Sequence, residues 1–193
     1  LRPVAVEHLV RLIEVRNNHL STGFVGTPLL CPVLSRYGHT DLAYKLLFQD
    51  TYPSWLYTVR NGATTMWERW NSYTREKGFG PVEMNSFNHY AYGAVGEWMY
   101  AVIGGIRCEA PGFSKVRIAP EPGPGIDSAK CALESPHGRI ACEWKLENEL
   151  LRICTVIPEG VEAALEVPLG YVLDSGDSPS LNGKQTLVAR QSL

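Results

Sequence analysis

The spacing of apolar residues changes near Gly104 and Gly105, and this change restricts the fold more than any other feature of the chain. Before these glycines, apolar residues recur every three or four positions, as in residues 6–13, which is the spacing of one helix face. After them, apolar and polar residues alternate in stretches that end at turn residues, which is typical of strands. The sequence therefore predicts an all-helical region followed by an all-β region, and it argues against an alternating parallel α/β protein.

Both regions can be divided further from the same patterns. Helices are predicted over residues 6–17, 28–37, 40–49, 53–61 and 87–103, with Thr27 as the N-cap of the second. Strands are predicted over residues 114–122, 129–135, 139–147, 150–158 and 161–169. Two short strands around a hairpin turn at Asn182 and Gly183 are expected in the last stretch. The strands should form an antiparallel sheet or sandwich.

Composition and charge exclude several classes of function. Apolar residues make up 45% of the chain and charged residues 20%, which is typical of a folded protein. The net charge is -2 without basic runs, so neither nucleic acid nor an anionic membrane is expected as a partner. No apolar run is long enough to span a membrane, and charged residues at the start argue against a signal peptide.

The chain shows no motif for a metal or a nucleotide. Its five cysteines lie singly, no CxxC pair occurs, and buried free thiols are expected, although Cys142 and Cys154 could face each other on neighbouring strands. Phosphate-binding loops and HExxH spacing are also missing from the sequence. We therefore expect no cofactor and no dedicated metal site, and the cysteines indicate no particular compartment.

Two nearby stretches combine aromatic, acidic and amide side chains. Trp67, Glu68 and Trp70 lie within TTMWERW, and Asn88 and His89 lie within MNSFNHYAYG. Indole faces can pack on sugar rings, amides and imidazoles can bind hydroxyls, and a carboxylate can activate water. This combination points to carbohydrate chemistry, with Arg69 as an orienting residue for a neighbouring carboxylate or carbonyl.

Each of these residues also has a structural interpretation. Thr65 and Glu68 have the spacing of a capping box, in which the glutamate would bind a backbone N–H. His89 could be a hydrogen-bonded interior histidine rather than a sugar contact. Of Trp67 and Trp70, we expect one to stack on sugar and the other to fill the core.

Four stretches, in order, make the chain resemble the C-terminal portion of bacterial α-L-rhamnosidases of the inverting glycoside hydrolase family 78. They are STGFVGTPLL, GATTMWERW, MNSFNHYAYGAVGEWMYAVIGGI, and PGFSKVRIAPEPGPGIDSAK followed by ESPHGRIACEW. The resemblance covers most of residues 20–145. It implies the C-terminal half of an (α/α)6 toroid over residues 1–105, a partial catalytic domain, followed by an antiparallel β-sandwich over residues 106–193.

The resemblance also implies roles for individual residues. Glu68 falls at the family's catalytic base, and His89 falls at a sugar-contacting histidine; Trp67, Trp70 and Asn88 would contact the sugar beside them. The family's general acid lies upstream in a loop rich in Asp, Glu, Arg and Trp, and nothing in residues 1–60 matches that loop.

The expected function is therefore that of a fragment of an inverting enzyme that removes terminal L-rhamnose from glycans or glycosides. Without the general acid, the chain alone should be inactive. The uncovered helix faces of half a toroid should lead to self-association. Two alternatives stay open: a non-catalytic carbohydrate-binding or accessory module, and another (α/α)6 sugar enzyme such as a glycoside phosphorylase, which would need an anion site beyond Arg69.

Overall fold

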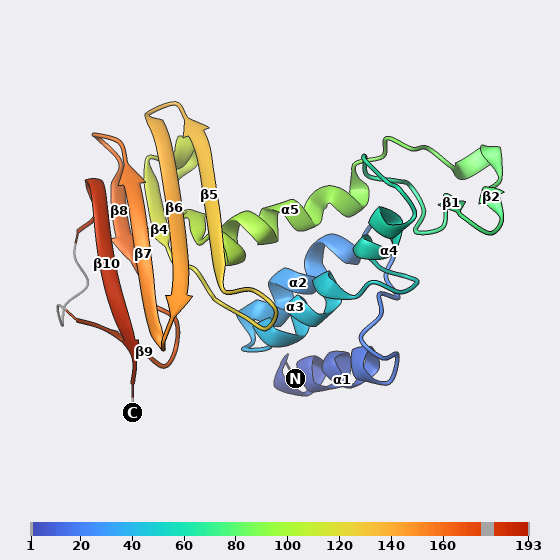
Figure 1. The fold of residues 1–193 in the computed structure, drawn as a ribbon, viewed down its shortest axis with the longest axis horizontal. Helices are drawn as coiled ribbons and strands as arrows, with labels where there is room; N and C mark the ends of the chain where they lie inside the picture. Colours follow the sequence, from blue (N-terminus) through green and yellow to red (C-terminus); the bar gives the residue numbers. More distant parts are fainter. Residues whose placement is uncertain (1, 175–179, 193) are drawn as a thin grey trace. The chain divides into compact units, whose positions relative to one another are not determined.

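A computed structural model describes residues 2–174 and 180–192 of the chain (Figure 1). Contacts divide the chain into two compact units, Leu1–Gly96 and Glu97–Leu193. The first, the helical unit, contains mainly helices and irregular segments, and the second, the β unit, contains mainly strands. The change in apolar spacing thus correctly predicts helices first and strands second.

The helical unit begins with α-helices that lie close to the predicted ranges. They are α1 (Arg2–Glu14), α2 (Thr27–Arg36), α3 (Thr40–Phe48) and α4 (Trp55–Arg60). Helix α2 packs against α3, and α3 packs against α4. The fully buried side chains of Leu34 in α2 and of Tyr44 and Leu46 in α3 form part of this contact region. After α4 the chain becomes irregular, with a small antiparallel pair β1 (Tyr73–Thr74) and β2 (Gly78–Phe79) and the 3-10 turns η1 (Val82–Met84) and η2 (Ala91–Ala94).

Helix starts differ from the predictions in three places. Helix α1 starts at Arg2 and ends at Glu14, whereas the predicted range is residues 6–17. Thr27 is the first residue of α2 rather than its N-cap, which is Gly26; the Thr27 hydroxyl instead donates to the Thr22 carbonyl at 3.2 Å. Helix α4 starts at Trp55 because the buried Ser54 hydroxyl caps it, accepting from the Tyr57 N–H at 3.2 Å.

The predicted long helix over residues 87–103 is wrong in its first turn and in its type. Residues 87–90 are not helical, and the segment then runs through η2, the short helix α5 (Val95–Trp98) and the π-helix η3 (Met99–Ile103). The boundary between the two units lies within α5. The apolar spacing identified a buried helical face but could not distinguish one helix type from another.

The β unit is built from two sheets that share one core (Figure 1). Its strands are β3 (Ile106–Cys108), β4 (Lys115–Ile118), β5 (Ser128–Ser135), β6 (Gly138–Glu147), β7 (Leu150–Ile157), β8 (Glu162–Leu165), β9 (Tyr171–Leu173) and β10 (Gly183–Gln191). One sheet has the order β5-β6-β7-β10-β9 and is antiparallel throughout, and the other has the order β3-β4-β8. Val116 and Ile118 from the smaller sheet and Ile140, Trp144 and Ile153 from the larger one lie in the same buried cluster.

Two predictions about the strands require correction. Strands β4 and β8 pair in parallel, because residues 119–161 form a crossover that contains β5, β6 and β7. Asn182 and Gly183 do not form a two-residue hairpin turn, since Gly183 is the first residue of β10 and lies opposite Ile157 of β7. Residues 175–179, which belong to the segment between β9 and β10, lie outside the described residues.

The described cysteines are all free, and the pairing across strands differs from the one considered. Cys131 of β5 lies directly opposite Cys142 of β6, while Cys154 of β7 lies opposite Glu143. Burial raises the pKa of the Cys142 thiol to about 12. Over residues 2–174 and 180–192, the structure contains no helix of the length and apolarity that a membrane span requires.

Candidate functional site

The irregular segment between α4 and η2 brings the two aromatic motifs together. The Glu68 N–H donates to the Ser86 carbonyl at 2.9 Å, and the His89 N–H donates to the Met66 carbonyl at 2.8 Å. The Thr65 hydroxyl also donates to the Phe87 carbonyl. These backbone contacts place the stretch around residues 65–70 beside the stretch around residues 85–89, as a site assembled from both motifs requires.

Glu68 is held by one of its two carboxylate oxygens. Its Oε2 atom accepts a hydrogen bond from the Ser86 N–H at 2.8 Å, and its side chain lies near the protein surface at intermediate exposure. The capping box with Thr65 is not formed, since residues 64–72 contain no helix and the bonded amide belongs to Ser86. Within the described chain, Oε1 has no hydrogen-bond partner, so it is available to accept one from a water molecule or a substrate hydroxyl.

A cavity of about 440 Å³ opens beside this carboxylate. It is lined by Phe24, Tyr52, Glu68, Arg69, Trp70, Asn71, Met84 and Tyr92. The volume lies at the lower end of the range typical of small-molecule sites, and the lining combines aromatic rings with an amide and charged groups. Such a lining can enclose one sugar ring and bind its hydroxyls.

Trp70 is the indole that lines the cavity. Its ring stacks on Tyr92 with centroids 3.9 Å apart and meets Trp55 edge-on at 5.6 Å. Trp55 is buried and donates from its indole nitrogen to the Tyr92 carbonyl at 2.9 Å. Contacts with Tyr92 and Trp55 therefore hold the Trp70 ring in place, which favours its use as a fixed wall.

The other predicted residues lie around the cavity rather than on its surface. Trp67 is buried against Tyr73 and Phe87, with ring centroids 6.4 and 5.2 Å away. His89 stacks on Phe24, which does line the cavity, with centroids 4.7 Å apart. Asn88 is exposed and does not line the cavity.

The imidazole of His89 also has a defined hydrogen-bonding role. Its Nδ1 atom accepts from the Ala91 N–H at 3.4 Å, which in the neutral ring leaves the proton on Nε2. His89 can thus donate from Nε2 while its ring supports Phe24. His89 is only half-buried, so it is not an interior histidine, and its contact with a sugar stays a prediction.

Several cavity residues were not singled out from the sequence as site residues. Phe24 lies in STGFVGTPLL, Asn71 follows WERW directly, and Tyr92 lies in NHYAYG, so the motifs already contained a signal for them. Met84 is the first residue of MNSFNHYAYG, whereas Tyr52 lies in a segment without such a motif, and only the folded chain brings Tyr52 to the cavity.

The electrostatics of the cavity keep one phenol neutral. Burial raises the pKa of Tyr92, the nearby Tyr52 raises it further, and the positive charge of Arg69 opposes both effects. Tyr92 therefore keeps its proton at neutral pH and can donate it in a hydrogen bond. Among residues 2–174 and 180–192, no group of His, Cys, Asp and Glu side chains has the arrangement of a metal site.

Comparison with protein families identifies both units. Residues 1–103 match the bacterial α-L-rhamnosidase six-hairpin glycosidase domain, and residues 105–178 match the bacterial α-L-rhamnosidase C-terminal domain. The chain belongs to the bacterial α-L-rhamnosidase family. It matches the C-terminal portion of that family, with the two domains in the order that the motifs indicated.

Individual rhamnosidases are similar over most of this chain. An α-L-rhamnosidase of Formosa agariphila is 50% identical over 164 residues, which is 85% of this chain and 18% of the relative. One of Streptomyces avermitilis is 49% identical over 171 residues, covering 89% of this chain and 17% of the relative. The chain thus spans less than a fifth of the length of these curated relatives.

Solved rhamnosidase structures have a similar fold. The Streptomyces avermitilis enzyme complexed with L-rhamnose matches 97% of this chain and 19% of that chain, with a TM-score of 0.84 and 42% identity. The native enzyme from Aspergillus terreus matches 96% of this chain and 21% of that chain, with a TM-score of 0.88 and 34% identity.

Proposed function

We propose that this chain is part of an inverting α-L-rhamnosidase, in which Glu68 is the general base for hydrolysis of terminal L-rhamnose from glycans or glycosides. One observation carries the proposal: the Glu68 carboxylate borders a cavity of about 440 Å³, anchored through Oε2 and unpaired at Oε1. An inverting enzyme needs such a positioned carboxylate to deprotonate the water that attacks the sugar. The L-rhamnose complex of a similar rhamnosidase supports this choice of sugar.

The remaining predicted residues are assigned to sugar binding at the same cavity. Trp70 is a wall against which the apolar face of the rhamnosyl ring can pack, and Trp67 supports the motif from the core side. His89 and Asn88 would contribute hydrogen bonds from the rim, where their side chains are partly or fully exposed.

The proposal also predicts that the isolated chain is inactive. Glu68 is the only carboxylate among the described residues that line the cavity. Inversion by single displacement requires a second carboxyl group, about 6.5–9.5 Å away, to protonate the leaving oxygen. We assign that acid to a part of the complete enzyme that precedes this chain, in the first half of an (α/α)6 toroid.

The same reasoning extends to the domains. Residues 1–105 are proposed as the C-terminal half of the toroid and residues 106–193 as a β-sandwich domain. Large apolar side chains are exposed in the helical unit, such as Val25 (86% exposed) and Val82 (90% exposed). Their exposure supports the proposal that further helices cover these faces in the complete enzyme. In the isolated chain, these faces should promote self-association.

The decisive experiment replaces Glu68 in a full-length rhamnosidase that carries this chain as its C-terminal portion. Glu68→Gln keeps the size and hydrogen-bonding shape of the side chain but removes its basicity, so kcat for an aryl α-L-rhamnoside should fall about 10³-fold. Glu83→Gln, in the exposed turn η1, is the matched control and should leave kcat unchanged. The proposal is wrong if both variants hydrolyse the rhamnoside at the wild-type rate, or if the isolated 193-residue chain turns it over.

A carbohydrate-binding module is the second candidate, and the single carboxylate at the cavity favours it. Such a module would bind L-rhamnosides equally well before and after the Glu68→Gln substitution, and restoring the missing half would add no hydrolysis. The full-length Glu68→Gln measurement therefore separates the two functions.

A further inference from the structure

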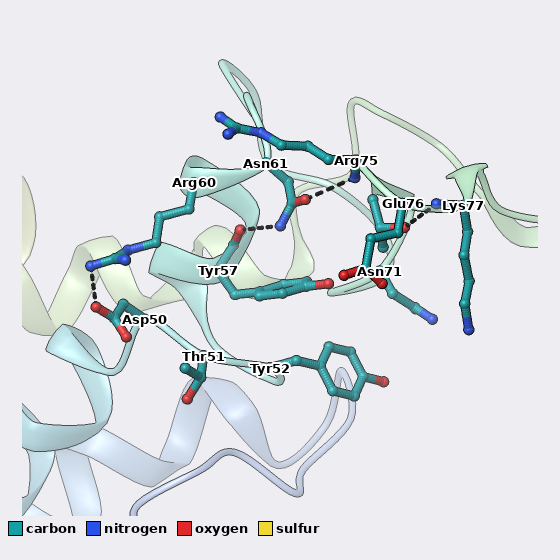
Figure 2. Close-up of a pocket in the computed structure, with 11 residues that line it drawn as sticks. Asp50, Thr51, Tyr52, Tyr57, Arg60, Asn61, Asn71, Arg75, Glu76 and Lys77 are labelled. Atoms are coloured by element: carbon teal, nitrogen blue, oxygen red, sulfur yellow. Dashed lines mark hydrogen bonds and ion pairs between the residues drawn. The ribbon is translucent and has the colours of Figure 1, made fainter.

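A groove with a volume of about 610 Å³ adjoins the Glu68 cavity, and the function proposed above leaves it without a role. Three segments of the helical unit line it: residues 50–52 after α3, residues 57–61 at the end of α4, and residues 71–77 around β1 (Figure 2). Tyr52 and Asn71 line both the groove and the cavity, so the two spaces are neighbours. Glu68 lines the cavity alone.

The walls of the groove are held by hydrogen bonds within the chain. The Asn61 amide donates from Nδ2 to the Tyr57 carbonyl at 2.9 Å and accepts through Oδ1 from the Arg75 N–H at 3.2 Å (Figure 2). The Thr74 hydroxyl accepts from the Lys77 N–H at 3.0 Å, which closes the loop on itself. One side chain thus ties the loop of residues 71–77 to the end of α4, so the width of the groove does not depend on a ligand.

Two aromatic rings provide apolar surface among the polar and charged residues of this groove. The rings of Tyr52 and Tyr57 meet edge-on, with centroids 5.4 Å apart and planes at 72°. Tyr52 is 52% exposed although it is a large aromatic residue in contact with another ring. Aromatic faces next to polar groups are the usual platform for the C–H face of a sugar ring.

The polar groups in the groove favour a hydroxylated ligand over an apolar one. Within the described chain, neither the Asn71 amide nor the Tyr57 hydroxyl has a hydrogen-bond partner, although both line the groove. A flat apolar ligand would remove these groups from water without pairing them, at a cost in free energy, whereas sugar hydroxyls would pair with them. Of the charged residues in the lining, Asp50 and Arg60 pair with each other. Arg75, Lys77 and Glu76 leave one excess positive charge, so the lining does not select a strongly charged ligand.

We propose that this groove binds a neutral sugar ring, the one that carries the terminal rhamnose in the substrate. The inference rests on the proposed rhamnosidase function and specifies its substrate class as rhamnosylated glycans. In single displacement, water attacks the face opposite the leaving sugar. The absence of Glu68 from the groove lining fits this requirement, because the leaving sugar must lie away from the base.

The test is a titration of the 193-residue chain followed by amide chemical shifts in nuclear magnetic resonance spectra. The two probes are methyl α-L-rhamnoside and 6-O-α-L-rhamnosyl-D-glucose. Amides of Glu68 and Ser86 report on the cavity, since they take part in the hydrogen bonds that hold the carboxylate. Amides of Arg75 and Lys77 report on the groove, since they bond to Asn61 and Thr74.

We expect methyl α-L-rhamnoside to shift the cavity amides alone. The disaccharide should shift the groove amides as well and bind about fivefold more tightly, as one or two added hydrogen bonds allow. Tyr57→Phe, which keeps the ring and removes the unpaired hydroxyl, should abolish most of that advantage. Tyr37→Phe is the matched control, since Tyr37 is also partly exposed and lies at the end of α2, away from both linings, so the advantage should persist.

The two proposals fail in different ways. If both probes shift the cavity amides and the disaccharide leaves the Arg75 and Lys77 amides unmoved, the groove proposal is overturned and the rhamnosidase proposal stands. If methyl α-L-rhamnoside leaves the cavity amides unmoved, the proposed function fails, and the groove proposal fails with it. The wild-type titration decides between these outcomes without any variant.

Discussion

The helical unit and the β unit differ in how they enclose their cores. In the β unit, residues from both sheets converge in one buried cluster, and Val116, Trp144 and Ile153 are fully inaccessible to solvent. In the helical unit, short helices bury one face each, while large apolar residues such as Val25, Val82 and Tyr90 remain more than 80% exposed. The β unit therefore has the features of a self-sufficient domain, whereas the helical unit has those of part of a larger one.

The two units also differ in what they contribute, since the β unit provides a stable core and the helical unit contains the candidate site. The β unit contributes regular strands whose alternating pattern produces the core. The candidate site lies in the other unit. Most of its residues belong to the irregular segment 61–90, where turns and backbone hydrogen bonds position the side chains, and Phe24, Tyr52 and Tyr92 complete it. Segments that carry binding groups are often irregular because their backbone must present side chains to a ligand rather than to a core.

The largest expected effect concerns two buried thiols, one in each unit. Burial raises the pKa values of Cys31 and Cys142 to about 12, so at pH 8 only about one thiol in 10⁴ is the reactive thiolate. With a disulfide reagent, both should react at least a thousandfold more slowly than they do in urea, and faster as the pH rises. Exposed Cys108 should react at once in the folded chain.

The urea concentration at which each buried thiol becomes reactive tests directly whether the helical unit is less stable than the β unit. Cys31 should be labelled at a lower concentration than Cys142, because its unit leaves apolar faces uncovered. Labelling of both at the same concentration would show that the two units unfold as one.

The second largest effect is expected on the stability of the β unit when its central indole, that of Trp144, is removed. Trp144 is fully buried, and its Nε1 atom donates to the Ile103 carbonyl at 2.6 Å. Trp144→Ala leaves a cavity and an unpaired carbonyl, so the free energy of unfolding of this unit should fall by about 3–5 kcal/mol. Trp144→Phe keeps most of the packing and should cost less than half as much. Urea unfolding followed by circular dichroism measures both, and equal losses would show that packing of the indole does not hold the core.

A smaller effect is expected at the start of α4 in the helical unit. The buried Ser54 hydroxyl accepts from the Tyr57 N–H, so Ser54→Ala removes the N-cap and should lower the free energy of unfolding of this unit by about 1 kcal/mol. Ser54→Gly should cost a few tenths of a kcal/mol. Thermal unfolding measures the difference, and a loss comparable to that of Trp144→Ala would mean that the helical unit is as tightly organised as the β unit.

The smallest effect on stability is expected at the exposed apolar residues. Val25→Ser with Val82→Ser should change the free energy of unfolding by less than about 0.5 kcal/mol, because neither side chain belongs to a core. The double variant should nevertheless self-associate less, which sedimentation velocity can measure. The matched control is Leu169→Ser in the β unit, an exposed residue of the same kind. If this control reduces self-association equally, the open faces of the helical unit are not the cause.

Local sequence patterns predicted helices and strands well where the same backbone geometry produces both the pattern and the element. Alternation located β5, β6 and β7 because successive side chains of a strand point to opposite faces. The parallel pairing of β4 with β8 could not be predicted, since it joins segments separated by three strands. The start of α4 depended on a single hydroxyl, that of Ser54, which the apolar spacing does not record.

The candidate site was predicted in part, for a similar reason. Residue types pointed to Glu68 and Trp70, which do line one cavity. Trp67 has the same side chain as Trp70 but lies buried away from the cavity, and no local signal distinguishes the two. Tyr52 reaches the cavity from a segment without any motif, because the packing of α3 and α4 carries it there.

The sequence by itself determined the order of a helical and a β region, the family and the chemical kinds of side chain at the site. These properties depend on residue spacing and identity, which are local. The tertiary structure decided that Ser86 holds the Glu68 carboxylate, which indole forms a cavity wall, and that a second groove adjoins the cavity. Such features arise from contacts between residues distant in the chain, and the free energy of those contacts is set only when the whole segment folds.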